Sequence, residues 1–254
     1  MGLMSNSFKN IFKAGFRETV RDGKTMFFIN FFPIFFIGLF ALIGVQVGEI
    51  NGIPAFEFML PGLLTFILLQ IAVFTVMQPL VEIKKNGTMA LFELTPLKKK
   101  DFIFSMLLLR MIYGLVWIII FIGIFLSLGS IHISQISLLL VVVSLGMFMV
   151  FSFGIMLSTF FNSVEAAGTW GGFIIVFIYM FSGSGGMLPN VKGFMKIVSQ
   201  FNPFSYLTQA IQQSLFKNIA ITFPLYVHLI IIIGTGLLFM IVSIKTFKWS
   251  LEGK

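Results

Sequence analysis

Few residues in this chain have side chains that could perform chemistry. The 254 residues include no cysteine, which excludes disulfide frameworks, thiolate metal sites and cysteine nucleophiles. The two histidines, His132 and His228, have no companion at the spacing of metal ligands, so we assign no metal to the chain. His228 could serve as a pH-sensitive gate, but an isolated histidine at the end of an apolar run is more simply interpreted as inert. No serine–histidine pair or pair of carboxylates lies inside an apolar run, which argues against an intramembrane protease or acyltransferase.

One short fragment imitates a nucleotide site. Gly23-Lys24-Thr25 resembles the end of a phosphate-binding loop. That motif needs a preceding strand and a glycine five residues earlier, where the chain has Glu18. We therefore predict that the chain has no nucleotide site, no cofactor and no enzymatic activity of its own.

Arg110 is a charged residue deep inside an apolar run. It follows Asp101 by nine residues, which places it roughly 13 Å further along a helix. We interpret it as a snorkelling side chain or as one member of a structural ion pair with Glu82 or Glu165, with contact to a substrate as the alternative. No acidic residue lies near the middle of an apolar run, which argues against coupling to protons or sodium ions.

The elements that must position these residues are predicted to be membrane-spanning helices. Hydrophobic residues make up 58% of the chain and charged residues 10%, and the mean hydropathy is +1.04. Soluble domains are roughly 45–50% apolar and 25% charged, so this chain must use lipid as its solvent. We predict an all-α integral membrane protein. Windows of about 20 apolar residues indicate six spans, near residues 26–47, 56–81, 102–128, 135–160, 167–182 and 224–245.

The basic residues predict the orientation of these spans. Most of the 17 lysines and arginines lie in the N-terminal segment, the 82–101 loop and the C-terminal tail, whereas Lys192, Lys196 and Lys217 share one connection on the opposite side. By the positive-inside rule, both termini and the 82–101 loop are cytoplasmic, and the protein crosses the plasma membrane (the inner membrane of a bacterium) several times. Because the positive charges lie beside spans, the net charge of +8 does not indicate nucleic-acid binding.

We predict two regions. Residues 1–25 form an amphipathic helix at the cytoplasmic interface, and residues 26–254 form a single six-span transmembrane domain. In the first region, apolar residues recur at helical spacing beside a basic stripe that repeats every four residues from Lys9 to Arg21. This helix either anchors the first span or acts as an elbow that moves with a cytoplasmic partner, and its amphipathicity supports both interpretations.

The 82–101 loop is predicted to carry a short helix. Asn86 and Thr88 favour a helix start, and the segment from Met89 to Leu94 makes barely two turns before Thr95-Pro96 ends it. The loop contains no domain in which the apolar side chains of this helix could be buried. We therefore prefer a contact with a soluble partner over a helix half-sunk in the lipid interface.

The fifth apolar run is too short to cross a bilayer. Ala167 to Phe181 spans about 22 Å at the rise of an α-helix, against a hydrocarbon thickness of about 30 Å. The 183–223 segment that follows is interrupted by glycines, by Pro189 and by Asn202-Pro203. We predict an extracellular re-entrant segment of two short amphipathic helices that enter and leave one leaflet, with a loop resting on the outer surface as the alternative.

The order of these features resembles the ABC-2 type transporter permeases. The resemblance covers essentially the whole chain: an amphipathic N-terminus, six spans, a short helix after the second span and a broken segment before the last. Its most specific parts are Leu94-Thr95-Pro96, Phe181-Ser182-Gly183, Leu188-Pro189 and Phe201-Asn202-Pro203-Phe204.

This resemblance implies partners and roles for individual residues. In that family two permease chains pair, and the loop after the second span is a coupling helix that docks on a separate ATPase subunit. The partners implied are therefore ABC ATPase subunits, which bind ATP and Mg²⁺, and a second permease chain in a homodimer or heterodimer. The resemblance assigns ATPase coupling to Gly87, Thr88, Leu91, Glu93, Leu94, Thr95 and Pro96. It assigns the extracellular gate to Phe181, Ser182, Gly183, Leu188, Pro189, Asn202 and Pro203.

The sequence departs from the family pattern at two places. Many relatives have a proline soon after the Phe-Ser-Gly motif, where this chain has Ser184-Gly185-Gly186. Many also have an acid–arginine pair where this chain has Gln212-Gln213. Roles that depend on those charges therefore do not carry over.

The predicted function is that of a permease subunit of an ATP-driven ABC exporter, which forms half of a dimeric pathway. The spans are rich in phenylalanine and methionine and poor in fixed charge, so the cargo is expected to be hydrophobic or amphipathic. Peptides, drugs and lipids all fit, which corresponds to peptide export or multidrug efflux, and we favour peptides. The alternative is an ion-coupled secondary carrier or channel, which the missing carboxylates and the absence of detectable repeats disfavour.

Overall fold

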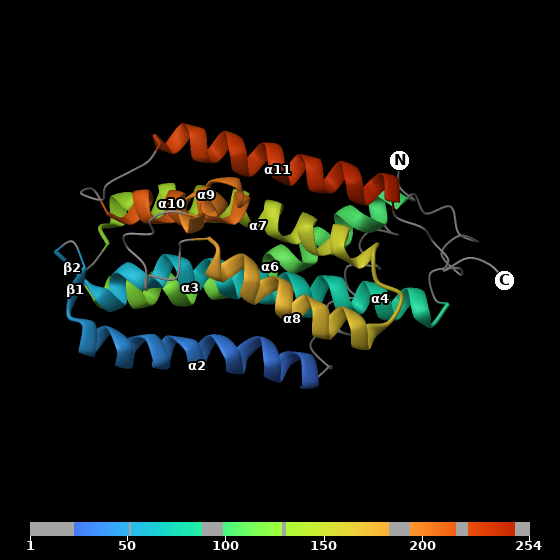
Figure 1. Cartoon of the computed structure of the whole chain (residues 1–254), viewed down its shortest axis with the longest axis horizontal. Helices are drawn as coiled ribbons and strands as arrows, with labels where there is room; N and C mark the ends of the chain where they lie inside the picture. Colours follow the sequence, from blue (N-terminus) through green and yellow to red (C-terminus); the bar gives the residue numbers. More distant parts are fainter. Residues whose placement is uncertain are drawn as a thin grey trace.

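The computed structural model describes residues 23–50, 52–87, 99–128, 131–182, 194–216 and 223–246. In this part of the chain the fold is a bundle of long helices that run roughly along one axis (Figure 1). The predicted N-terminal amphipathic helix lies almost entirely outside the described residues, so it stays a prediction.

Each predicted span corresponds to a helical element in the described residues. These elements are α2 (Gly23–Val47), α3 (Ala55–Ile71) continued by the π-helical turn η1 (Ala72–Met77) and by α4 (Gln78–Lys85), α6 (Lys99–Ser127), α7 (Ile133–Ser158), α8 (Val164–Met180) and α11 (Leu225–Thr246). A small hairpin of β1 (Glu49–Ile50) and β2 (Ile53–Pro54) joins α2 to α3, and two short helices, α9 (Phe194–Phe201) and α10 (Pro203–Leu215), precede α11.

Five elements of the described residues are long and apolar enough to cross a membrane. The ranges are Asn30–Val47 in α2, Ala55–Lys85 across α3, η1 and α4, Ser105–Ser127 in α6, Ile133–Ser158 in α7 and Leu225–Thr246 in α11. The helix of the fifth apolar run, α8, has only 17 residues. That length corresponds to about 26 Å, which falls short of a hydrocarbon layer of about 30 Å. The fifth apolar run therefore forms a short helix, as the sequence indicated, and its incomplete crossing of the membrane stays a prediction.

The helix ends divide between the two ends of the bundle. α2 begins and α11 ends at one end, beside the end of α4 and the turn between α7 and α8, whereas the β-hairpin and the start of α11 lie at the other end (Figure 1). The second span runs further than the sequence indicated. It includes Lys84 and Lys85, which the prediction placed in the 82–101 loop.

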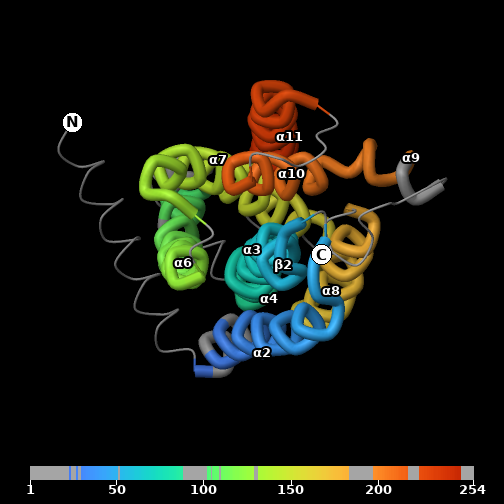
Figure 2. The backbone as a smooth tube through the Cα atoms, turned by 90° about the vertical axis from the view of Figure 1, so that its left-hand side faces the viewer, coloured from blue at the N-terminus to red at the C-terminus, as the bar shows by residue number. Residues whose placement is uncertain are grey.

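The continuous helix α3–η1–α4 occupies the centre of the bundle. Figure 2 shows it end-on, with α2, α6, α7, α8 and α10 around it and α11 packed outside α7 and α10. Of the residues in the most apolar stretch of this span, 94% are buried inside the bundle. A helix that is apolar on every side is expected to be surrounded by other helices, because no side of it needs to face water.

Two glycines allow neighbouring helices to approach the π-helical turn closely. A Cβ atom at Gly154 of α7 would lie 2.8 Å from the carbonyl oxygen of Ala72, and one at Gly171 of α8 would lie 2.6 Å from side-chain atoms of Val73 and Met77. Between helices in lipid, such close contact of small residues replaces the hydrophobic driving force as the source of packing energy.

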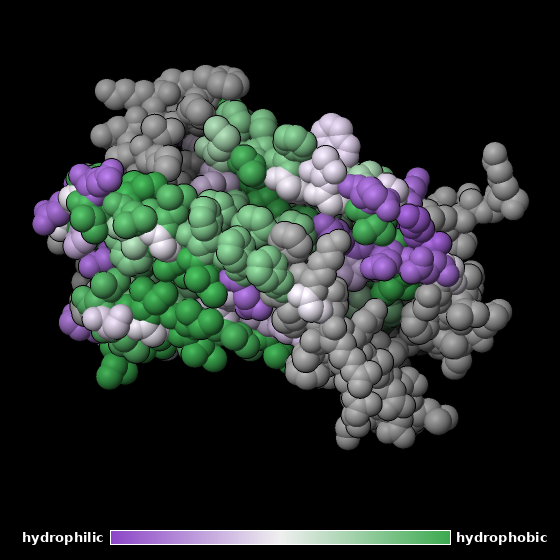
Figure 3. Space-filling view, turned by 90° about the horizontal axis from the view of Figure 1, so that it is seen from below, coloured by the Kyte–Doolittle hydropathy of each residue, from purple (hydrophilic) through white to green (hydrophobic). Residues whose placement is uncertain are grey.

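The outer surface of the bundle is apolar. Phe31 and Ile34 on α2 and Tyr226 and Ile230 on α11 are exposed. Figure 3 shows hydrophobic residues gathered over the length of the bundle and hydrophilic residues gathered toward its two ends. This distribution is typical of helices whose outer faces contact lipid.

The glycine contact at the π-helical turn can be tested by adding one methyl group. Gly154→Ala places a Cβ against the Ala72 carbonyl, and we expect it to destabilise the protein by about 1–3 kcal/mol because a backbone atom cannot move aside. The control is Gly123→Ala in α6, where nothing lies within 4 Å of the new Cβ. That variant should be neutral or stabilised by up to about 1 kcal/mol, since alanine is the better helix former. Melting temperatures of the detergent-solubilised protein measure both, and equal values would contradict the contact.

Candidate functional site

Asn202 connects the broken segment to the end of α8. Its backbone is extended, and its side-chain oxygen accepts a hydrogen bond from the backbone N–H of Phe204 at 3.1 Å, which caps α10. Pro203 takes the first helical position, where a missing N–H has no cost. The Asn202 Nδ2 donates to the carbonyl of Ile178 at 2.9 Å, in the last turn of α8. One side chain therefore starts α10 and satisfies a free carbonyl of α8.

α8 ends at the predicted Phe-Ser-Gly motif. The backbone N–H of Phe181 donates to the carbonyl of Phe177, and the Ser182 hydroxyl donates to the carbonyl of Tyr179 at 2.7 Å. The rings of Phe177 and Phe181 lie 4.4 Å apart. Of the predicted gate residues, the structure thus brings four to the junction of α8 and α10: Phe181, Ser182, Asn202 and Pro203. The other three, Gly183, Leu188 and Pro189, lie outside the described residues.

α10 is packed into the bundle along one face. Leu207 lies over Gly146 of α7, where a Cβ atom would collide with the leucine side chain. The Thr208 hydroxyl donates to the hydroxyl of Thr65 on α3 at 2.8 Å. The buried residues of this face include Phe204, Leu207, Ala210, Ile211 and Leu215. α10 is therefore held between the central helix and α7 by both apolar and polar contacts.

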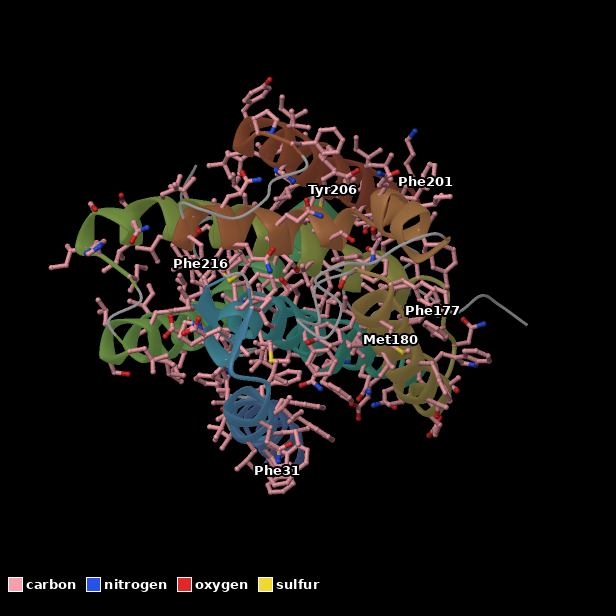
Figure 4. The ribbon with its side chains drawn as sticks, turned by 60° about the vertical axis from the view of Figure 1, so that its left-hand side comes forward. Phe31, Phe177, Met180, Phe201, Tyr206 and Phe216 are labelled. Atoms are coloured by element: carbon pink, nitrogen blue, oxygen red, sulfur yellow. The ribbon has the colours of Figure 1, made fainter. Side chains whose placement is uncertain are left out.

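The side of α8 that faces away from the bundle is aromatic. Its exposed residues recur at helical spacing, and Phe201 at the end of α9 is 84% exposed. The exposed apolar residues of this surface are Trp170, Phe173, Phe177, Met180 and Phe201. Figure 4 shows Phe177, Met180 and Phe201 on the same side of the molecule. We call these five residues the aromatic face.

His228 is not isolated, which corrects the interpretation drawn from the sequence. It is fully buried at the start of α11 and contacts two glutamines of α10. Its Nε2 lies 3.0 Å from Oε1 of Gln209, and its Nδ1 lies 3.3 Å from Nε2 of Gln213, which also donates to the carbonyl of Phe223 at 2.8 Å. The histidine therefore joins α11 to α10 through both of its ring nitrogens.

The connection that is predicted to couple to an ATPase begins at the opposite end of the bundle, after α4. α4 ends at Lys85 with Asn86 as its C-terminal cap, and Gly87 adopts the left-handed conformation (φ +69°) that commonly follows helices. Lys84 Nζ donates to the carbonyl of Ser158 at 2.8 Å, and Lys85 Nζ lies 3.3 Å from Oε1 of Glu165. The other predicted coupling residues lie outside the described residues: Thr88, Leu91, Glu93, Leu94, Thr95 and Pro96.

A comparison with known protein families identifies the family of this chain. The family model described as ABC-2 type transporter matches residues 6–216. This chain belongs to the ABC-2 type transporter family. The resemblance drawn from the sequence is therefore confirmed, and the ABC-2 protein is a multi-pass membrane transport component rather than itself a catalyst. A comparison with curated proteins found no match.

The family match includes both ends of the candidate site in this ABC-2 protein. It contains the connection after α4 and the Asn202-Pro203 break, and it ends at Phe216, the residue that caps the C-terminus of α10. α11, which supplies His228, lies beyond the match. The contact of His228 with α10 was missed from the sequence, although the four-residue spacing of Gln209 and Gln213 indicated a polar stripe that a partner could meet.

Arg110 of the ABC-2 protein is buried inside the bundle. It lies in α6 and is 3% exposed, so its side chain is enclosed by protein, and its snorkelling or ion-pair role stays a prediction. Glu165, one of its two predicted partners, is held by Lys85 instead. Enclosure of a cationic side chain is costly in a membrane and is compatible with a structural role.

The double role of Asn202 predicts a graded loss of stability. Asn202→Ala removes both the cap of α10 and the donor to the Ile178 carbonyl, and should cost about 1–3 kcal/mol. Asn202→Ser keeps a capping oxygen but cannot reach Ile178, so its effect should be intermediate. Asn162→Ala, at an exposed asparagine, is the control and should change stability by less than about 0.5 kcal/mol. Thermal unfolding in detergent measures all three, and equal melting temperatures for the two alanine variants would contradict the role.

Proposed function

We propose that this ABC-2 protein is the permease subunit of an ATP-driven exporter. Two permease chains together form the pathway, and separate ABC ATPase subunits that bind ATP and Mg²⁺ supply the energy. The observation that carries the proposal is the separation of two specialised regions within one family-matched bundle. The connection after α4 lies at one end, and the broken α9–α10 segment lies in the other half of the molecule (Figure 1).

The broken segment is suited to closing a pathway. Irregular backbone at membrane depth must be satisfied within the protein, and Asn202 and Ser182 supply such bonds at the end of α8. The burial of α10 against α3 and α7 favours the predicted re-entrant segment over a loop that rests on the outer surface. In the proposed orientation, this segment is extracellular and the termini and the connection after α4 are cytoplasmic.

The aromatic face supports a hydrophobic or amphipathic cargo. Its five residues contain no charge and are exposed in the single chain, so a second permease chain facing α8 would share a pathway lined by aromatic rings. Such rings accept apolar groups and can stack on other aromatic groups. We propose export of a hydrophobic or amphipathic peptide, and drug or lipid export as the related candidates.

An ion-coupled carrier or channel is the alternative, and no observation on the described residues favours it. Glu49 lies in β1 and Glu57 in the first turn of α3. Glu82 lies in the last turn of α4, Asp101 in the first turn of α6 and Glu165 in the first turn of α8. Coupling to protons or sodium ions usually requires a carboxylate within the membrane interior. These described acidic residues therefore lie where charged residues flank the ends of spans, which does not favour a site for a coupling ion.

The partner assignment can be tested by purification from native membranes. An ATPase should co-purify with the affinity-tagged chain, and the purified complex should hydrolyse ATP in the presence of Mg²⁺. The chain purified alone should hydrolyse no ATP. Leu91→Glu with Leu94→Glu should abolish the hydrolysis, because charges would be placed on the apolar surface of the coupling helix. Ile133→Glu, at an exposed residue in the first turn of α7, should leave it unchanged. Undiminished ATPase recovery with the leucine variants would refute the coupling helix.

The proposed orientation can be tested without first removing native cysteines, because the chain contains none. A cysteine introduced at Asn86 should react with a membrane-impermeant maleimide only from the cytoplasmic side, and one at Phe201 only from the outside. Both positions are exposed. A cysteine at Ile232, which is fully buried, is the control and should not react from either side. The opposite labelling pattern would reverse the proposed topology.

A further inference from the structure

Two consecutive lysines at the end of α4 hold both sides of one turn. Lys84 donates from Nζ to the carbonyl of Ser158, the last residue of α7, at 2.8 Å. Lys85 pairs through Nζ with Oε1 of Glu165 in the first turn of α8, at 3.3 Å. Successive residues of a helix point in directions about 100° apart. One short stretch of α4 can therefore contact the end of α7 and the beginning of α8 at once.

The two lysine contacts differ in environment. Lys84 is 7% exposed, whereas the Lys85 and Glu165 side chains are 48% and 74% exposed. A buried ammonium group needs a fixed acceptor, and the free carbonyls at the C-terminus of α7 carry the negative end of the helix dipole. Glu165 is in turn favoured near the positive N-terminus of α8. Lys84 is therefore the firm contact, and the exposed Lys85–Glu165 pair is the weaker one.

Other contacts reinforce the same joint. A Cβ atom at Gly168 of α8 would lie 3.1 Å from the side-chain nitrogen of Gln78, so α8 and α4 approach closely one turn further along. The Thr246 hydroxyl at the end of α11 donates to the hydroxyl of Thr159 at 3.2 Å. The turn between α7 and α8 is thus fastened to α4 on one side and to α11 on the other.

α8 continues from this joint to the broken segment. Its first turn carries Glu165, and its last turn carries the Ile178 carbonyl that Asn202 binds at 2.9 Å. α8 has 17 residues and no proline, so it is one continuous helix between these two attachments. Displacement at its first turn would therefore be delivered to the start of α10.

We propose that Lys84 and Lys85 are positioning residues that transmit movement of α4 through the α7–α8 turn and along α8 to the Asn202 junction. This inference rests on the proposed function, in which an ATPase acts on the connection that follows α4. On this inference, a variant without Lys84 still binds the ATPase and hydrolyses ATP, but hydrolysis no longer moves the broken segment.

The experiment uses the complex captured from native membranes through the tagged chain, with a cysteine introduced at Gln200 as the reporter. Gln200 is exposed in α9. Three quantities are measured: the amount of co-purified ATPase, the rate of ATP hydrolysis, and the maleimide labelling rate at residue 200 with and without ATP and vanadate. The parent complex should show a nucleotide-dependent change in labelling of about fivefold.

Lys84→Met should retain the ATPase and its hydrolysis, but its labelling should change by less than about 1.5-fold with nucleotide, because the coupling energy is lost. Lys84→Arg keeps a cationic donor and should restore most of the response. Lys245→Met is the matched control, since Lys245 is an exposed lysine in the last turn of α11, and it should behave like the parent. A full labelling response in Lys84→Met would overturn the proposal.

A charge-reversal series covers the case in which Lys84→Met does not fold. Lys85→Glu and Glu165→Lys should each reduce the labelling response, and the double variant should restore it, because the pair is exposed and is only inverted. Additive losses in the double variant would overturn the role of the pair. If the parent complex contains no ATPase, the proposed function itself fails and this inference fails with it. If the ATPase is present and all lysine variants respond like the parent, only the joint is wrong.

Discussion

The packing of the second span at the centre of the bundle is the constraint on which the other elements depend. Lipid tails are as apolar as leucine, so burial of apolar surface gives little energy for holding helices together in a membrane. The helices must instead touch closely, and they do so at η1 through Gly154 of α7 and Gly171 of α8. Because α7 and α8 are both positioned on this one turn, the turn that joins them and the junction at the end of α8 are positioned as well.

The π-helical turn gives this contact a geometric cause. A π-turn adds a residue to the helix and changes the direction of side chains and carbonyls locally, which is why such turns are frequent at functional sites. The Thr75 hydroxyl donates to the carbonyl of Ile71 at 2.7 Å, a bond that satisfies a backbone oxygen inside the apolar core. The widened turn thereby pairs the Thr75 hydroxyl and still offers a close surface to two neighbours.

A second constraint acts where the regular helices stop. Backbone groups at a break cannot turn to water in the membrane interior, so side chains must satisfy them. Asn202 does this for α8 and α10 together, and the contacts of His228 with Gln209 and Gln213 secure α10 to α11. α10 is therefore attached to its neighbours at both ends, to α8 through Asn202 and to α11 through His228.

In the proposed mechanism, α8 links the two specialised regions of the molecule. At one end the lysine pair of α4 contacts the α7–α8 turn, and at the other end Asn202 binds the last turn of α8. A short helix attached at both ends is a simpler link across the bundle than a chain of side-chain contacts, since its own hydrogen bonds keep its length constant.

The sequence by itself determined the features that depend on local length and composition. The apolar runs located the spans, because a helix needs about 20 residues to cross lipid. The short run before Phe181 predicted the short α8, and Asn202-Pro203 predicted the start of α10, because capping and the lack of an N–H on proline are local properties. The order of these motifs also indicated the family.

Only the tertiary structure decided which residues meet. The contact of Thr208 with Thr65 joins positions 143 residues apart, and that of Lys84 with Ser158 joins positions 74 residues apart. Such contacts depend on how each helix is rotated about its axis, and a helix that is apolar on every side leaves no pattern in the sequence from which that rotation can be derived. For the same reason the sequence showed His228 as isolated. Lys84 was placed in a loop because the apolar run ends before it, whereas the helix continues to Lys85 and the fold buries Lys84 against α7.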